Sequence, residues 1–283
     1  MRSDRLAIGT AAFGLPYGAT RPLLKVDKRE CFHILDASSQ LGIIKLDTSP
    51  YYGCAQRIIG EFGAKRFQIY TKIDGLDLLK KDGEAVFLKS IGDLRIDSVY
   101  GCFLQGIENW ARQDLEKIIS RLNSYKLSTR IRKIGISCYS PEKAMSISKQ
   151  LGLSLVQVPY NILDRRASTC GLFQWAADNG VEVFVRSIFM QGLLLREPDK
   201  RRNGKFPIDA IGKIRNQLKQ KRVRALDLCA SFSFNTSNKS FLVFGVASRQ
   251  ELQSIKKINP TKYQDIKIPP TPWNDNFDPR NWR

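Results

Sequence analysis

The sequence predicts an α/β protein, a single (β/α)8 or TIM barrel domain with an irregular C-terminal tail, and two observations lead to this fold. First, eight short apolar runs alternate with longer helical patterns along the 283 residues, and a chain of about 250 residues is typical of such a barrel. Second, the main alternative, a doubly wound parallel sheet, needs a glycine-rich fingerprint that opens a helix after an early strand. The segment Gly9 to Gly14 is not such a fingerprint, because no helical pattern begins at its end.

The predicted strands are short runs rich in β-branched, aromatic and other apolar side chains, bounded by polar or glycine-containing turns. In chain order they are Leu6 to Gly9, Ile43 to Leu46, Phe67 to Thr71, Ser98 to Leu104, Lys133 to Ile136, Leu155 to Val158, Glu182 to Val185 and Phe241 to Phe244.

The stretches between these strands show the spacing of amphipathic helices. They are Lys28 to Leu41, Gln56 to Phe62, Ala111 to Tyr125, Pro141 to Leu151, Ala167 to Asn179 and Arg249 to Lys256. Ser140 before Pro141 indicates a capped helix start, and Asn179 before Gly180 indicates a helix end.

Two polar segments complete the domain, which we take to span residues 1–283. The connection 196–206 follows the seventh strand, so in a barrel it lies on the catalytic face. The tail 259–283 is rich in proline, asparagine and tryptophan, and we expect it to pack as an irregular arm.

Composition limits the classes of function. The net charge of +19 favours anionic partners, but basic stretches such as Lys213 to Arg224 alternate with apolar residues, as in amphipathic helices. No nucleic-acid motif is present, so we expect a small molecule, anionic in part, rather than nucleic acid as the partner. The chain has no long apolar segment and no signal-peptide pattern, so we expect a cytoplasmic protein that does not enter membranes.

Cysteine and histidine usage argues against metal sites and disulfides. The six cysteines form no Cys-x-x-Cys pair, and His33 is the single histidine. We therefore expect reduced thiols, no metal, and a structural or surface position for His33.

Four polar residues fall where neighbouring strands of the barrel end. Asp47 and Lys72 close the second and third predicted strands, Tyr52 follows the second, and Gln105 closes the fourth. Because catalytic groups of barrels lie at the C-terminal strand ends, these side chains can meet at one mouth. We interpret them as a proton donor, in which an Asp47–Lys72 ion pair lowers the pKa of Tyr52. The alternative is that Asp47 caps a loop, Tyr52 packs and Lys72 is a surface cation.

These motifs resemble the signature of the aldo-keto reductases, and the resemblance runs from Gly9-Thr10 to the last helix. Asp47, Tyr52 followed by Gly53, and Lys72 match the family's catalytic pattern. The resemblance implies a reduced nicotinamide cofactor, NADP or NAD, and a carbonyl substrate.

Further segments match the family's cofactor contacts. Ser137 and Gln157 correspond to the carboxamide contacts, Arg186-Ser187 to the position that stacks on the nicotinamide, and Gly245 to Ser248 to the phosphate grip. The resemblance therefore implies these cofactor-binding residues: Gly9, Thr10, Ser137, Gln157, Arg186, Ser187, Gly245, Val246, Ser248 and Arg249. The run Asp164-Arg165-Arg166, with Arg186-Ser187 through Gln191-Gly192, is most similar to bacterial members found with surface-sugar genes.

Four positions depart from the family pattern. Gln105 stands where the family has a histidine, and glutamine carries no titratable proton. Cys138 replaces an asparagine, so one hydrogen-bond donor is missing. Glu251 replaces the arginine that meets the 2′-phosphate of NADP, although Arg249 is nearby, and Arg186 replaces an aromatic residue, although a guanidinium can also stack.

Three functions remain open at this point. The first is an active oxidoreductase with Tyr52 as proton donor and Gln105 orienting the substrate oxygen. The second is a barrel that binds cofactor, has weak or lost turnover, and acts as a binding or regulatory protein. The third is a barrel that binds nucleic acid or another anionic surface.

Overall fold

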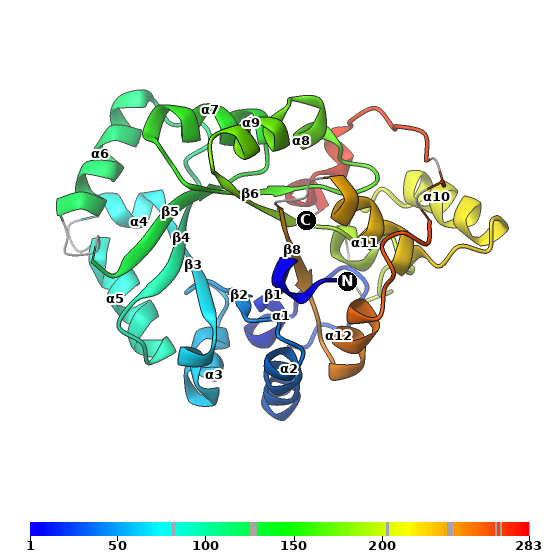
Figure 1. The fold of residues 1–283 in the computed structure, drawn as a ribbon, viewed down its shortest axis with the longest axis horizontal. Helices are drawn as coiled ribbons and strands as arrows, with labels where there is room; N and C mark the ends of the chain where they lie inside the picture. The colour runs from blue at the N-terminus through cyan, green and yellow to red at the C-terminus, as the bar shows by residue number, and fades with distance from the viewer. Residues whose placement is uncertain are drawn as a thin grey trace.

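The protein forms a closed barrel of eight parallel strands. The computed structural model describes residues 1–80, 83–124, 129–201, 204–236, 240–263, 265–266 and 268–282. The strands pair in chain order and β8 pairs with β1, which closes the barrel and confirms the predicted fold class (Figure 1). They are β1 (Leu6–Gly9), β2 (Lys45–Asp47), β3 (Gln68–Asp74), β4 (Val99–Gln105), β5 (Ile131–Ser137), β6 (Leu155–Pro159), β7 (Glu182–Arg186) and β8 (Phe241–Gly245).

Helices surround the strands, and short 3-10 turns join several of them (Figure 1). The α-helices are α1 (Ala11–Gly14), α2 (Lys28–Gln40), α3 (Ala55–Phe62), α4 (Gly75–Leu79), α5 (Gly83–Leu94), α6 (Arg112–Ser124), α7 (Pro141–Leu151), α8 (Arg166–Thr169), α9 (Leu172–Asp178), α10 (Ile208–Gln220), α11 (Ala225–Thr236) and α12 (Arg249–Lys256). The 3-10 helices are η1 (Ser3–Arg5), η2 (Ala64–Arg66), η3 (Met190–Gly192), η4 (Asp275–Phe277) and η5 (Pro279–Trp282).

Local signals predicted some boundaries well and others poorly. The bounds of α7 and α12 are those expected, and the Ser140 hydroxyl accepts a hydrogen bond from the Lys143 amide at 3.2 Å, as an N-cap does. The predicted helix 167–179 is wrong as a single element, because Gly171 adopts φ +76° and divides it into α8 and α9. Helix α5 is absent from the prediction.

The barrel interior explains why polar residues gather at one end. Six side chains fill its centre, and Tyr70 contacts Phe184 with ring centroids 4.5 Å apart. Because side chains alternate along a strand, the residue two positions further on points into the barrel one layer higher. The six interior residues are Ala7, Tyr70, Phe103, Leu155, Phe184 and Val243, and the layer above them comprises Gly9, Lys72, Gln105, Gln157, Arg186 and Gly245.

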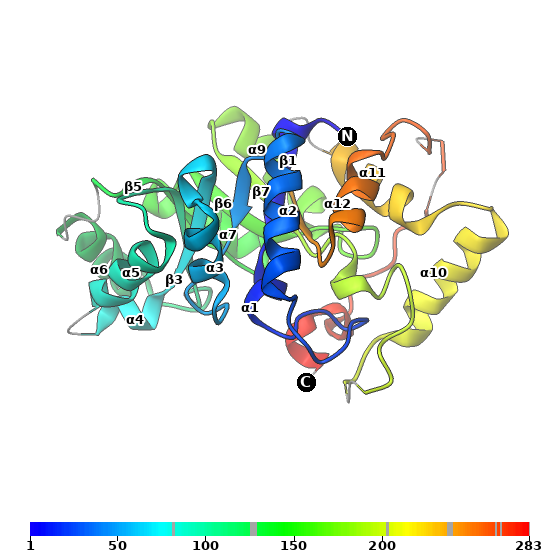
Figure 2. The ribbon, with the colours of Figure 1, turned by 90° about the horizontal axis from the view of Figure 1, so that it is seen from below.

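The C-terminal tail packs against the mouth of the barrel. Figure 2 shows the C-terminal segment on the side where α1 follows β1, opposite the N-terminus. Arg280 forms an ion pair with Glu108, in the loop after β4, at 3.0 Å, and Trp273 lies under Arg166 at 3.4 Å from ring centroid to guanidinium carbon. The described part of the tail is thus an irregular arm, as expected, and it borders the mouth of the barrel.

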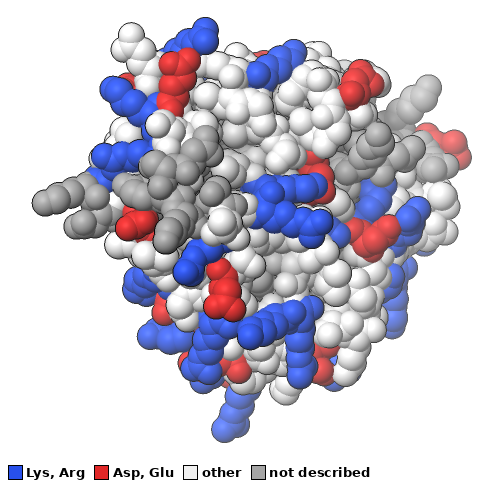
Figure 3. Space-filling view, turned by 60° about the vertical axis from the view of Figure 1, so that its left-hand side comes forward, with Lys and Arg blue, Asp and Glu red and all other residues white. Residues whose placement is uncertain are grey.

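Much of the positive charge lies on helix surfaces. Figure 3 shows basic side chains spread among acidic ones over one face of the molecule. On α5 and α6, pairs such as Lys89–Asp93 and Arg112–Glu116 join residues one turn apart. His33 is also at the surface, beside Glu30. Among the described residues, no helix is long and apolar enough to cross a membrane.

Candidate active site

A buried ion pair lies at the centre of the barrel mouth. The ammonium of Lys72 is 2.5 Å from Asp47 Oδ1, and the two side chains are 4% and 7% exposed. Gln157 Nε2 donates to the same carboxylate oxygen at 2.8 Å, and the Ser137 hydroxyl donates to Gln157 Oε1 at 2.9 Å. Asp47 ends β2 as expected, whereas Lys72 lies two residues before the end of β3. Side chains from four strands therefore form one connected polar network.

Tyr52 lies in the turn that follows β2, next to this network. The Lys72 ammonium is 5.1 Å from the centroid of the Tyr52 ring. The turn is held by a close approach of two glycines: Gly53 has φ +55°, and a Cβ there would lie 2.5 Å from the carbonyl oxygen of Gly14. A Cβ on Gly14 would in turn lie 1.8 Å from the Tyr52 carbonyl oxygen. Glycine at both positions allows the backbone contact that places Tyr52 over the ion pair.

The expected lowering of the Tyr52 pKa is wrong for this structure. Burial raises the pKa of the Tyr52 phenol above its ordinary value, and the charge of Asp47 adds to this, while Arg186 acts in the opposite direction. The Lys72 ammonium, which contacts the Asp47 carboxylate directly, does not lower the pKa of the phenol here. Burial in turn lowers the pKa of Lys72, although Asp47 opposes that shift. The phenol of Tyr52 therefore holds its proton at neutral pH.

The adjacent tyrosine has a structural position. The Tyr51 hydroxyl donates to Asp77 Oδ2 at 2.6 Å and accepts from the Asp74 amide at 2.9 Å. These contacts connect the turn after β2 to α4 at the surface. Tyr51 and Tyr52 are thus neighbours in sequence with different surroundings.

An elongated pocket of about 510 Å³ begins at Asp47 and Tyr52 and extends to the N-terminal part of α12 at Gln250 and Glu251. Other predicted cofactor residues that line it are Gly9, Arg186, Ser187 and Gly245. Four arginines are also among its lining residues: Arg21, Arg186, Arg196 and Arg224.

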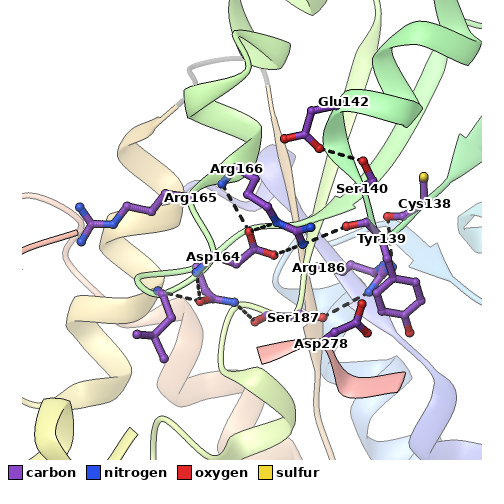
Figure 4. Close-up of polar contacts among 12 residues, drawn as sticks. Cys138, Tyr139, Ser140, Glu142, Asp164, Arg165, Arg166, Arg186, Ser187 and Asp278 are labelled. Carbon is purple, nitrogen blue, oxygen red and sulfur yellow. Dashed lines mark hydrogen bonds and ion pairs between the residues drawn. The ribbon is translucent and has the colours of Figure 1, made fainter. Parts of the chain in front are cut away.

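Arg186 lies at the end of β7 and stacks on a tyrosine of this protein. Its guanidinium is 4.1 Å from the centroid of the Tyr139 ring, and it donates to the Cys138 carbonyl at 3.2 Å and to the Ser187 hydroxyl at 3.4 Å (Figure 4). Arg280 from the tail lies 4.3 Å from the same ring centroid. Within the described part of the chain, Arg186 has no carboxylate within ion-pair distance.

Several predicted residues lie beside the pocket rather than on its wall. The Thr10 hydroxyl donates to the Asp47 carbonyl at 3.0 Å, and Val246 is buried. Ser248 caps α12, where its hydroxyl accepts from the Glu251 amide at 3.1 Å. The side chain of Arg249 is exposed and is not part of the pocket lining.

Gln105 ends β4 and belongs to the layer of residues that faces the mouth. It is partly exposed, and it is not part of the pocket lining. Among the described residues, none forms a hydrogen bond to its side-chain amide. The NH2 and the carbonyl oxygen of this amide are therefore available to a molecule at the mouth.

Sequence reasoning missed the residues that surround the mouth from other loops. Tyr17 lines the pocket, and the Tyr139 amide donates to Glu108 Oε1 at 2.5 Å. Arg280 joins this group from 172 residues away along the chain. No local pattern marks these residues, because their contacts depend on loop conformation and on the path of the tail.

Comparisons with known proteins show the family and agree with the barrel fold. A family model described as the aldo/keto reductase family matches residues 5–268. The structure is similar to an aldo-keto reductase of Bacillus halodurans in its holo form, with 21% identity, a TM-score of 0.67, and 94% of this chain and 88% of that chain covered. It is also similar to a glycerol dehydrogenase of Gluconobacter oxydans, with 17% identity, a TM-score of 0.66, and 90% and 86% covered. A search of curated proteins gives no match.

Proposed function

The chain belongs to the aldo/keto reductase family, and from this premise we propose that it reduces the carbonyl group of a small molecule with NADH or NADPH, with Tyr52 as proton donor. Family membership indicates an oxidoreductase. The observation that carries the finer proposal is the position of Tyr52, which lies at one end of the elongated pocket, directly beside the buried Asp47–Lys72 pair.

The pocket residues fit a nicotinamide dinucleotide. An elongated volume of about 510 Å³ suits a long ligand, and the arginines on its wall suit a ligand with a pyrophosphate. Arg186 and Arg196 are the clearest cases, since no described residue forms an ion pair with either, whereas Arg21 and Arg224 are paired with Glu251 and Asp227. Ser137 and Gln157 lie outside the pocket lining, and Gln157 is fully buried, with its amide nitrogen donating to Asp47 and its amide oxygen accepting from Ser137. These two residues therefore give no direct support for a carboxamide contact.

The residues of the mouth can then complete a carbonyl reduction. When bound, a reduced nicotinamide would supply a hydride to the carbonyl carbon. Tyr52 holds the matching proton on its hydroxyl oxygen and transfers it to the carbonyl oxygen as negative charge develops there. The positive charge of Arg186 favours the phenolate that remains. The Asp47–Lys72 ion pair lies next to the Tyr52 ring and holds it in position. Gln105 orients the substrate oxygen through its side-chain amide.

The surroundings of Arg186 favour an anionic substrate. The charges of Asp47 and Lys72 offset each other, so Arg186 leaves the inner end of the pocket with a net positive charge. A carboxylate or phosphate on the substrate can meet that charge. We also propose that the substrate is sugar-derived, because of the resemblance of the segments at Asp164 and Arg186 to members found with surface-sugar genes.

Two observations favour the second function, a cofactor-binding barrel with weak turnover. Gln105 cannot exchange a proton, and burial keeps the pKa of Tyr52 high. Both features slow proton transfer without affecting the parts of the pocket that hold a dinucleotide.

A panel of aldehydes, ketones and keto-sugars, neutral and anionic, tests the proposal. We expect NADH or NADPH to quench tryptophan fluorescence, and we expect oxidation of the cofactor with at least one anionic member of the panel. Tyr52→Phe abolishes this reaction if the proposal holds, and Tyr51→Phe is the matched control because it removes a hydroxyl that faces away from the pocket. Binding without turnover supports the second function, and no binding of either nucleotide contradicts both.

A further inference from the structure

Two protein carboxylates lie on the N-terminus of α12, at the outer end of the pocket. Glu251 Oε2 accepts a hydrogen bond from the Ala247 amide at 2.9 Å, and it forms an ion pair with Arg21 at 2.6 Å. Glu30 Oε1 accepts from the Arg249 amide at 2.7 Å. With Ser248 capping the Glu251 amide, these acceptors satisfy three backbone amides around the helix start.

Helix N-termini ordinarily favour anions, because their first amides lack partners within the helix and the helix dipole is positive there. In this protein the anion at that position is the side chain of Glu251. A phosphate placed there has to displace Glu251 from both the Ala247 amide and Arg21. A phosphate placed beside it meets a like charge at short range, which costs binding energy.

The position of Glu251 in the pocket decides which part of a dinucleotide it meets. Glu251, Gln250 and Ser254 line the pocket at α12, whereas Asp47 and Tyr52 line it at the barrel axis. If the nicotinamide lies beside Tyr52, as the proposed function requires, the adenosine half extends toward α12. The adenosine ribose is also the part in which the two cofactors differ, with a 2′-hydroxyl in NADH and a 2′-phosphate in NADPH.

We propose that Glu251 makes this protein select NADH over NADPH, and this inference rests on the proposed function. The Glu251 carboxylate accepts a hydrogen bond from the 2′-hydroxyl of NADH, as an acidic residue does in other dinucleotide sites. The same carboxylate repels the 2′-phosphate of NADPH, and it forms an ion pair with Arg21, the cation beside it that could otherwise help to neutralise that phosphate. The side chain of Arg249 does not offset this, since it is exposed and outside the pocket lining.

Equilibrium binding tests the inference without any turnover. We would measure dissociation constants of NADH and NADPH by tryptophan quenching, and of 5′-ADP and 2′,5′-ADP by calorimetry. The two ADP compounds report on the adenosine end alone. We expect wild type to bind NADH at least about tenfold more tightly than NADPH, which corresponds to about 1.4 kcal/mol, and to prefer 5′-ADP in the same way.

Two variants assign the effect to its residue. Glu251→Gln keeps the shape and the acceptor for the Ala247 amide but removes the charge, so we expect the NADH preference to fall to about twofold or less. Glu30→Gln is the matched control, because it removes a carboxylate from the same helix start outside the pocket, and we expect it to leave the preference unchanged. Circular dichroism confirms that both variants are folded.

Three results would overturn the inference, and they differ from failure of the proposed function. Wild type that binds NADPH as tightly as NADH contradicts it, and this measurement needs no variant. An unchanged preference in folded Glu251→Gln contradicts it as well, as does a Glu30→Gln variant that shifts the preference equally. If neither dinucleotide binds to wild type, the proposed function itself fails, and the inference fails with it.

Discussion

The two ends of the pocket each contain a carboxylate paired with a cation, but their surroundings differ. At the inner end, Lys72 and Asp47 are 2.5 Å apart and their side chains are 4% and 7% exposed. At the outer end, Arg21 and Glu251 are 2.6 Å apart and their side chains are 24% and 36% exposed. The two ion pairs therefore have similar lengths but differ in their exposure to solvent. The inner pair is closed off from solvent, whereas the outer pair is partly exposed to it.

The largest expected effect comes from breaking the inner pair. Lys72→Met leaves the Asp47 carboxylate buried without its cation, and we expect this to lower the free energy of unfolding by about 3–5 kcal/mol. Lys80→Met is the matched control, because Lys80 pairs with Asp77 at 2.6 Å with 69% of its side chain exposed. Such exposed pairs contribute about 0–1 kcal/mol. Denaturant unfolding of the two variants measures the difference, and equal losses would contradict the distinction between buried and open pairs.

A smaller loss is expected from the turn that positions Tyr52 above the inner pair. Gly53→Ala places a Cβ 2.5 Å from the Gly14 carbonyl oxygen at φ +55°. We expect a loss of about 1–3 kcal/mol in unfolding free energy and a reduced rate of carbonyl reduction, because Tyr52 must shift. Gly152→Ala is the control, since Gly152 has φ +63° with nothing within 4 Å of the added Cβ. A Gly53→Ala variant as active and as stable as Gly152→Ala would show that the glycine contact does not position Tyr52.

Gln105→His changes a side chain at the inner end of the pocket and leaves the Asp47–Lys72 ion pair intact. The side chain of Gln105 has no hydrogen-bond partner among the described residues, so the change in unfolding free energy should stay within about 0.5 kcal/mol. A titratable imidazole beside the substrate oxygen should raise the rate of carbonyl reduction by about tenfold. Steady-state kinetics on an active panel member measure this rate. An unchanged rate would favour the cofactor-binding barrel with weak turnover.

The smallest effect is expected at the rim, where Arg280 joins the tail to Glu108. The Arg280 side chain is 52% exposed, so Arg280→Ala should cost about 0.2–1 kcal/mol of unfolding free energy. Thermal unfolding measures this loss, with Arg2→Ala as a control because Arg2 pairs with Asp4 at the surface. A loss as large as that of Lys72→Met would mean that the tail is an integral part of the fold.

The strand pattern and the inner end of the pocket were predictable from the sequence. Every strand has a short apolar run, and strand order in a barrel follows chain order, so Asp47, Lys72 and Gln105 had to meet at one mouth. The Asp47–Lys72 pair follows from that topology. The direction in which the Tyr52 pKa shifts could not be predicted from the sequence, because it depends on how deeply the phenol is buried.

The remaining features depend on contacts that no local pattern encodes. Helix α5 begins at Gly83 and contains Gly92, and both glycines weaken a helical signal. Arg21 reaches Glu251 across 230 residues, and Arg280 reaches Glu108 across 172. The sequence indicated that Glu251 stood at an unusual position, but only the structure pairs it with Arg21 and the Ala247 amide.

Single-turnover reduction, with protein in excess over NADH and an active carbonyl substrate, separates binding from chemistry and so shows whether Tyr52 donates the proton. For Tyr52→Phe we predict NADH affinity within about twofold of wild type and a rate of hydride transfer lower by on the order of a hundred- to ten-thousand-fold. Tyr51→Phe, the neighbouring control, should retain the wild-type rate. Hydride transfer at the wild-type rate in Tyr52→Phe would contradict the assignment of Tyr52 as the proton donor.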